Sequence, residues 1–131
     1  MKRCLLDSSF VVDLLNEIAD NVNGPALSWL ERNASARLWI RPVTLAEVLE
    51  GAAEPEFVRT YLARYGWQGI HRIHADRVAI LQRRAARRFG ENDAWQGAIA
   101  EQMGGVLVAH DRAFRRLGSR YEDYRRGSSR T

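Results

Sequence analysis

A helix, a double glycine and a buried strand follow one another in the last third of the chain, and this order constrains the fold most strongly. Asn92 can cap the helix, and Asp93 stands in its first turn, where the helix dipole favours a negative charge. Gly104-Gly105 ends the helix, because glycine readily takes the left-handed conformation of a C-terminal cap. The apolar run Val106–Ala109 is typical of a strand buried on both faces of a parallel sheet, and Asp111 follows it. We therefore predict an α/β fold, which places its chemistry at the carboxyl ends of strands.

Size and composition indicate one globular domain in a reducing compartment. The 131 residues suffice for one hydrophobic core, and 46% hydrophobic and 27% charged residues are ordinary globular values. The 20 Lys and Arg residues exceed the 16 Asp and Glu residues, which permits an anionic partner such as nucleic acid. Cys4 is the single cysteine, so an internal disulfide is excluded, and no apolar run is long enough to span a bilayer. We expect a single domain over residues 1–131, cytoplasmic and without a membrane partner, with a flexible basic tail from about residue 125.

Strands and helices alternate along the rest of the chain, as a parallel sheet with crossover helices requires. Residues 4–6 predict a first strand that ends at Asp7, and Ser8 or Ser9 can cap the next helix. Residues 38–43 predict a second strand, residues 70–74 a third, and residues 121–124 an edge strand. Thr44 and Glu47 have the spacing of a capping box, in which each side chain satisfies a backbone N–H of the other residue.

Four acids stand next to the predicted strands, and each has an ordinary structural explanation when it is taken singly. Asp7 and Asp111 can cap helices, Glu47 can complete the capping box, and Asp93 can compensate a helix dipole. A doubly wound sheet, however, brings all four positions to one edge, where like charges repel one another. A divalent cation would offset this repulsion, and carboxylate oxygens suit Mg²⁺ or Mn²⁺ better than Zn²⁺. Such ions activate water and stabilise charge on phosphate, so the set predicts phosphodiester hydrolysis.

Several other polar side chains keep two interpretations. His110 could transfer a proton, although a solvent-facing histidine is the more common case. Ser9 and Thr44 could bind a phosphate or a metal-bound water, and helix capping explains them equally well. Arginines on a predicted helix and after the last acid could contact phosphates or form solvated faces; they are Arg77, Arg83, Arg84, Arg87, Arg88, Arg112, Arg115 and Arg116.

Ordered segments of the chain resemble PIN-domain ribonucleases, and most closely the VapC-like toxins of bacterial toxin–antitoxin pairs. They are LLDSS (5–9) with VVDLL (11–15), VTLAEVLEG (43–51), NDA (92–94), and VLVAHD (106–111) with Phe114. The resemblance covers nearly the whole chain. It implies a PIN-like three-layer α/β fold with a five-stranded parallel sheet in the order 3-2-1-4-5, flanked by helices. It also implies Mg²⁺- or Mn²⁺-dependent endonucleolytic cleavage of RNA, usually tRNA or rRNA, with the catalytic and metal-binding acids Asp7, Glu47, Asp93 and Asp111.

The same resemblance implies partners, and one residue departs from the family pattern. The partners are a second copy of the chain, in a homodimer, and a cognate antitoxin whose C-terminal segment blocks the acidic cleft. Ala109 stands where the family usually has Thr or Ser, two residues before its last acid, and so removes a hydroxyl that could support the site. This departure favours an alternative, a non-catalytic PIN-like module that binds RNA or protein. A phosphoacceptor domain of receiver or haloacid-dehalogenase type is disfavoured, because Ser9 replaces the Asp of the second and Lys2 is the only lysine.

Overall fold

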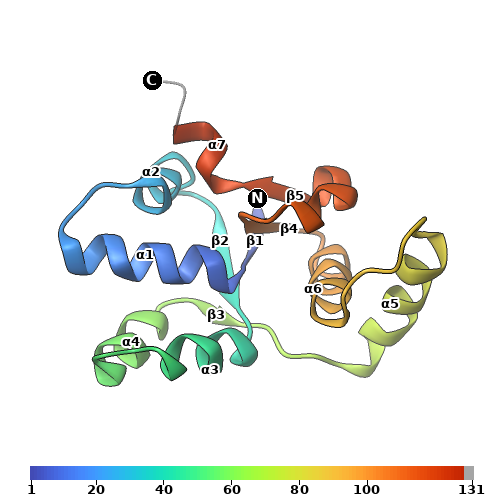
Figure 1. Ribbon diagram of the computed structural model, residues 1–131, viewed down its shortest axis with the longest axis horizontal. Helices are drawn as coiled ribbons and strands as arrows, with labels where there is room; N and C mark the ends of the chain where they lie inside the picture. Colours follow the sequence, from blue (N-terminus) through green and yellow to red (C-terminus); the bar gives the residue numbers. More distant parts are fainter. Residues whose placement is uncertain (129–131) are drawn as a thin grey trace.

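The structure, a computed structural model, describes residues 1–128, in which parallel strands alternate with helices (Figure 1). In chain order the elements are β1 (Arg3–Leu6), α1 (Ser8–Asp20), α2 (Pro25–Arg32), β2 (Arg37–Ile40), α3 (Pro42–Glu50), α4 (Pro55–Leu62), β3 (Gly66–Trp67), α5 (Arg72–Arg84), α6 (Glu91–Gln102), β4 (Val106–Ala109), the 3₁₀ helix η1 (Arg112–Arg120), β5 (Tyr121–Asp123) and α7 (Tyr124–Ser128).

The strands form one five-stranded sheet in the order β3-β2-β1-β4-β5. All four strand pairs are parallel, with Leu5 of β1 opposite Trp39 of β2 on one side and Leu107 of β4 on the other. Every strand therefore has its carboxyl end at the same edge of the sheet. The fold and strand order predicted from the sequence are confirmed.

Helices cover both faces of the sheet, and the side chains alternate between the two faces as the pleat requires. Cys4, Leu6 and Val108 pack with α1–α4 and α7, whereas Leu5 and Leu107 pack with α6 and η1. Figure 1 shows α1, α2 and α4 to the left of β1 and β2, α3 below these strands, and α5 and α6 to their right. Nowhere in the described part of the chain is there a helix long and apolar enough to cross a membrane.

The third strand lies earlier than the sequence analysis predicted. It is Gly66–Trp67, whereas the predicted residues 70–74 run into the first turn of α5. The helix begins there because His71 and His74 form a capping box, each side chain accepting a hydrogen bond from the backbone N–H of the other. Gly66 suits the edge position, since a Cβ there would lie 2.5 Å from the Trp39 ring of the paired strand.

Three predicted helix caps are also corrected. Pro42 begins α3, so β2 ends at Ile40 and the Thr44–Glu47 capping box does not form. Proline suits this position because the first helical N–H has no partner within the helix. Asp7 rather than a serine caps α1, and Gly90 rather than Asn92 precedes α6. The predicted basic tail enters α7, while residues 129–131 lie outside the described part of the chain.

Candidate acidic site at the carboxyl edge of the sheet

Asp7 lies at the centre of the carboxyl edge, because β1 is the central strand. Its backbone N–H donates to the Val108 carbonyl at 3.0 Å, and its carboxylate accepts hydrogen bonds from the backbone N–H of Ser9 at 3.2 Å and from the Ser9 hydroxyl at 2.7 Å. Ser9 also accepts from the His110 backbone N–H at 3.3 Å. The start of α1 is thereby tied to the segment that follows β4, which carries Asp111.

Glu47 approaches the same edge from the other neighbouring strand. It lies one turn into α3, which follows β2, and its carboxylate accepts from the Ser8 hydroxyl at 2.5 Å. Arg41, the N-cap residue of α3, places its guanidinium within electrostatic reach of both Asp7 and Glu47. Burial lowers the pKa of this guanidinium, and the two carboxylates raise it again in part. Two adjacent serines at the start of α1 thus hold the two acids, Ser8 bonding to Glu47 and Ser9 to Asp7.

Asp93 lies in the first turn of α6 and brings a third segment to the site. Burial raises the pKa of its carboxyl, and the nearby carboxylates of Asp111 and Asp7 raise that pKa further, while Arg116 lowers it. Asp111 caps η1 through the Ala113 backbone N–H at 2.9 Å. Asp93 therefore lies close enough to Asp111 and to Asp7 for their carboxylates to repel its own.

Unpaired polar atoms lie buried in the elements that carry these acids. Within the described residues, the buried atoms that have no hydrogen-bond partner are Arg41 Nε, Thr44 Oγ1 and both polar atoms of the Gln96 side chain. Arg41 and Thr44 belong to the start of α3, and Gln96 lies one turn after Asn92 on the same face of α6. Unpaired buried polar groups are rare and costly, so their presence points to water, an ion or a ligand at this place.

The chemistry of the site fits a hard divalent ion. No three Asp, Glu, His or Cys side chains of the described chain are grouped tightly enough to hold a metal by themselves. Mg²⁺ does not need such a cage, because it usually keeps several waters and binds through one or two carboxylates. The site offers carboxylate oxygens and repulsion that a cation would relieve. The residues present therefore fit Mg²⁺ or Mn²⁺.

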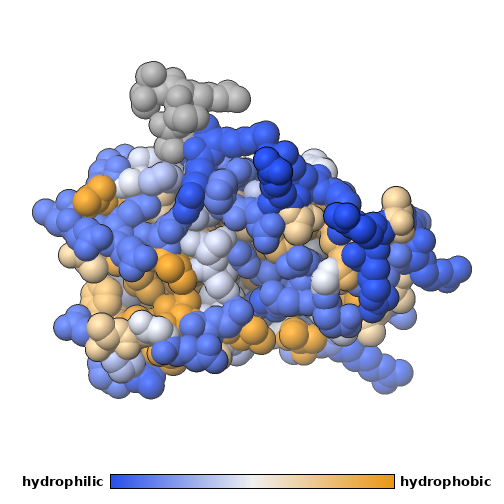
Figure 2. Space-filling view, viewed as in Figure 1, coloured by the Kyte–Doolittle hydropathy of each residue, from blue (hydrophilic) through white to orange (hydrophobic). Residues whose placement is uncertain are grey.

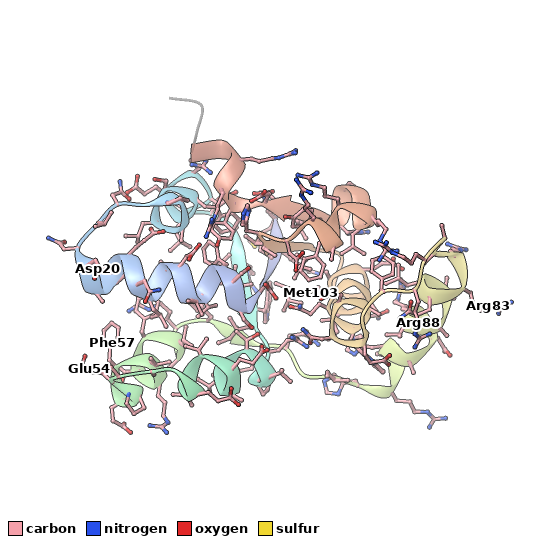
Figure 3. All side chains as sticks on the ribbon, in the orientation of Figure 1. Asp20, Glu54, Phe57, Arg83, Arg88 and Met103 are labelled. Carbon is pink, nitrogen blue, oxygen red and sulfur yellow. The ribbon has the colours of Figure 1, made fainter. Side chains whose placement is uncertain are left out.

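The structure also places the histidine, the alanine and the arginines that the sequence analysis considered. The exposed His110 side chain pairs with Asp123, with Nδ1 3.1 Å from Oδ1. Ala109 is fully buried in the apolar cluster with Ile99 and Phe114. Arg83 and Arg88 lie at the right-hand end of the molecule, away from α1 and α3 (Figure 3). Of the arginines considered from the sequence, Arg116 has an electrostatic effect on the site.

An apolar groove runs from the acidic site between α1, α3 and α4. It has a volume of about 450 Å³, and its lining includes Val12, Leu15, Val48 and Phe57 together with the acids Glu47 and Glu54. Val12 and Phe57 are each 43% exposed, and Figure 2 shows apolar surface at this place on the left of the molecule. Glu47 thus belongs both to the acidic edge and to the groove.

Arg41 is the residue that sequence analysis missed. It is 1% exposed, and its Nη2 donates to Asn92 Oδ1 at 3.0 Å, which joins the starts of α3 and α6. One feature of the sequence could have indicated Arg41: it follows a strand, at the carboxyl edge of the sheet where functional residues of α/β folds lie. An arginine beside a proline is usually exposed, so its type gave no indication of burial.

Taken together, the fold and the acidic edge define a class: an α/β protein with a 3-2-1-4-5 parallel sheet whose acids meet at the carboxyl ends of the central strands. The family model of the PIN domain matches residues 4–119, and the chain therefore belongs to the PIN domain family. Comparison with curated protein sequences found no match.

Solved structures of toxin–antitoxin complexes contain chains with the same fold. A chain of a toxin–antitoxin complex from Klebsiella pneumoniae is 20% identical with a TM-score of 0.75, and the match covers 92% of this chain and 97% of that one. A chain of VapBC-1 from nontypeable Haemophilus influenzae is 18% identical with a TM-score of 0.69, covering 93% and 98%. A chain of VapBC2 from Rickettsia felis, bound to a DNA fragment from their promoter, is 18% identical with a TM-score of 0.68, covering 92% and 97%. At these identities the likeness is one of fold.

Proposed function

We propose that this single-domain protein is a metal-dependent endoribonuclease and the toxin of a toxin–antitoxin pair, acting in the cytoplasm on tRNA or rRNA. The observation that carries the proposal is the electrostatic proximity of Asp93 to Asp111 and Asp7 at the carboxyl edge of a PIN-domain sheet. Folds avoid such crowding of like charges unless it serves a ligand. The presence of this fold in toxin–antitoxin complexes supports the biological role.

In this proposal the four acids Asp7, Glu47, Asp93 and Asp111 hold Mg²⁺ or Mn²⁺. The bound ion would supply an activated water and stabilise charge on the attacked phosphate. The protein's own residues position these groups: Ser9 orients the Asp7 carboxylate and Ser8 orients Glu47. Arg112 and Arg115 are exposed and lie within four residues after Asp111. Their side chains would contact phosphates of the RNA backbone, and such contacts do not depend on the base sequence.

A magnesium titration with an RNA cleavage readout tests this function. Purified protein is incubated with total tRNA or rRNA in EDTA and then in increasing Mg²⁺ or Mn²⁺. The proposal expects cleavage only with the ion. RNA binding without cleavage at any ion concentration would instead support the non-catalytic binding module, which the loss of a hydroxyl at Ala109 favours.

We further propose that the cognate antitoxin covers the apolar groove with its C-terminal segment. The groove combines the apolar side chains of Val12, Leu15 and Phe57 with the acids Glu47 and Glu54. An amphipathic segment that carries apolar residues and a basic residue complements this lining, and helices in apolar grooves are a common mode of recognition. Because Glu47 lines the groove, such a segment would also block the acidic site.

For the homodimer, we propose α5 as the contact. Ile73 and Ile80 are 56% and 46% exposed and lie two turns apart on this helix, and Ile70, just before it, is 48% exposed. Apolar side chains in one row favour contact with a second copy. Light scattering of the native chain and of Ile73→Asp tests this, and a native chain that is monomeric at micromolar concentration would contradict it.

A further inference from the structure

The residues from Tyr121 to Tyr124 contact both of the segments that carry Asp7 and Asp111. They comprise β5 and the first residue of α7, and they lie beyond residue 119, where the match to the family model ends. β5 pairs with β4 in parallel, so it runs alongside the strand that Asp111 follows. Two tyrosine hydroxyls in this segment form the contacts with the two acid-bearing segments.

Tyr121 holds the segment that carries Asp111. Its hydroxyl accepts a hydrogen bond from the backbone N–H of Asp111 at 3.1 Å. Its ring packs against Phe114, with the ring centres 5.9 Å apart, and this packing limits the directions in which the hydroxyl can point. Two residues further along β5, Asp123 pairs with the His110 ring, with Nδ1 3.1 Å from Oδ1. β5 therefore contacts both residues that follow β4.

Tyr124 holds the segment that carries Asp7. It is fully buried, and its hydroxyl hydrogen-bonds the backbone carbonyl of Ser9 at 3.2 Å and also the carboxylate of Asp13. The Ser9 hydroxyl in turn donates to the Asp7 carboxylate at 2.7 Å. The Tyr124 ring meets the Phe10 ring edge to face, with the centres 4.9 Å apart. Tyr124 thus fixes the first turn of α1, from which Asp7 is oriented.

Both hydroxyls act without occupying the oxygens that a metal ion would use. Tyr121 bonds the main chain of Asp111, and Tyr124 bonds the main chain of Ser9, so neither bonds a carboxylate of the four acids. Asp111 needs such support, because it is exposed and β4 ends two residues before it, at Ala109. The ligands of a metal site must be held to within roughly 0.5 Å of their working positions.

We infer that Tyr121 and Tyr124 are positioning residues, which hold Asp111 and Asp7 in place for a divalent ion. The inference rests on the proposed function, because it concerns the same acidic site. Tyr121 acts through the backbone N–H of Asp111, and Tyr124 acts through Ser9, whose hydroxyl orients Asp7. Neither tyrosine needs to touch the ion or the RNA. Loss of either hydroxyl leaves all four carboxylates present but less well placed.

Removing one hydroxyl at a time tests the inference. Tyr121→Phe and Tyr124→Phe keep both rings, and in the second variant Asp13 keeps its ion pair with Arg125 at 2.7 Å. Mn²⁺ alone is titrated calorimetrically into the full chain without RNA. Each variant should bind the ion at least about fivefold more weakly than the native chain, since groups that orient metal ligands typically contribute this much or more.

Tyr65→Phe is the matched control. It also removes one hydrogen-bonded hydroxyl, since the Tyr65 hydroxyl lies 3.2 Å from that of Tyr61, but this pair belongs to α4 and the turn after it. The control should lose stability, as the other two variants do, and change the affinity for Mn²⁺ by less than about twofold. If Tyr121→Phe or Tyr124→Phe binds Mn²⁺ as well as Tyr65→Phe does, the inference is overturned.

A double-mutant cycle separates positioning from stabilisation. In a Ser9→Ala background the route from Tyr124 to Asp7 is already broken. Tyr124→Phe should therefore change the affinity for Mn²⁺ by less than about twofold in that background, while its effect on the free energy of unfolding persists. A full further loss of affinity overturns the route through Ser9. At saturating Mn²⁺, both tyrosine variants should also lower kcat for RNA cleavage and leave KM unchanged, because the arginines proposed to bind RNA are intact.

The amide of Asp111 gives a readout that needs neither an ion nor RNA. In the native chain its hydrogen exchange, followed by NMR, should be slowed although Asp111 is exposed, because the N–H is bonded to Tyr121. Tyr121→Phe should speed this exchange about tenfold, as expected for the loss of one hydrogen bond, and Tyr65→Phe should not. Unprotected exchange of this amide in the native chain overturns the inference.

The positioning role and the proposed function fail in different ways. If the native chain binds Mn²⁺ and cleaves RNA, but the tyrosine variants bind the ion like the control, the nuclease function stands and the positioning role is lost. If Mn²⁺ binding depends on both tyrosines as expected but no RNA is cleaved, the positioning role stands and the nuclease function is lost. A native chain that does not bind Mn²⁺ overturns both.

Discussion

The backbone N–H of Asp7 donates to the carbonyl of Val108 at 3.0 Å, which extends the β1–β4 pairing by one residue beyond β1. This bond places Asp7 next to the segment that carries Asp111, since Asp111 is three residues after Val108. It involves only main-chain atoms, so a substitution of either acid leaves the bond itself intact. The role of the carboxylates can therefore be tested separately from the fold.

Asp93→Asn and Asp7→Asn should each reduce metal-dependent RNA cleavage by about 100-fold or more while the protein stays folded. The reason is that the charge stabilisation supplied by a bound ion contributes several kcal/mol to the barrier, and each carboxylate helps to hold that ion. Cleavage is measured with Mg²⁺ in excess, and folding by circular dichroism. Asp20→Asn is the control, because Asp20 is an exposed acid at the opposite end of α1 from Asp7 (Figure 3). Activity that survives in either site variant contradicts the proposed function.

Sequence periodicity was sufficient to predict an α/β fold with a parallel sheet, and the resemblance to PIN-domain ribonucleases implied the strand order; both are confirmed. The apolar run Val106–Ala109 behaves as expected because it is buried on both faces of the sheet, where few other elements fit. The position of β3 was not predictable in this way. Gly66–Trp67 is a two-residue edge strand with no alternation to detect, whereas residues 70–74 alternate and yet begin a helix.

The interior of the site was less accessible to prediction than its acids. Capping boxes are local, so the Thr44–Glu47 spacing suggested one, but Pro42 starts the helix earlier and leaves Thr44 buried. The burial of Arg41 depends on α3 and α6 meeting, a contact between residues 51 positions apart that no local pattern reports. Buried charges such as Arg41, whose positions depend on tertiary contacts, therefore cannot be predicted from local sequence patterns.

Phe57→Glu should weaken antitoxin binding by at least about tenfold and leave RNA cleavage unchanged. The added charge would stand in the apolar groove beside Glu54, where it meets the apolar face of the proposed segment and is costly to desolvate. Binding is measured by calorimetry with the cognate antitoxin. Val22→Glu is the matched control, since Val22 is an exposed apolar residue, 54% accessible, that does not line this groove. If both variants bind like the native chain, the antitoxin does not use this groove.

Cys4 should be unreactive towards thiol reagents in the folded protein and reactive once the chain is unfolded. It is fully buried in β1, and burial raises the pKa of its thiol from 9.0 to about 11, so little reactive thiolate forms. Labelling with a chromogenic disulfide at pH 8, with and without urea, measures this, and rapid labelling of the native chain would count against it.

The same shift predicts a loss of stability at alkaline pH. Because the folded thiol ionises later than the unfolded one, the contribution of Cys4 to the free energy of unfolding is present below pH 9.0 and falls as the pH rises towards about 11. Urea titrations of the native chain and of Cys4→Ala across this range should show a shallower decline for the variant. If the stability of both proteins declines equally with pH, ionisation of Cys4 does not cause the decline.

Gly105→Ala should destabilise the protein by about 2 kcal/mol, because it overpacks a contact between two main chains. A Cβ at this position would lie 2.6 Å from the carbonyl oxygen of Arg3, and that backbone cannot move without disturbing the pairing of β1 with β4. Gly51→Ala is the matched control, since a Cβ there meets nothing within 4 Å and its φ of −103° suits alanine. The control should be neutral or stabilise by up to about 1 kcal/mol through the unfolded state. Urea denaturation measures both variants, and equal stabilities would mean that β1 and β4 approach less closely than the structure shows.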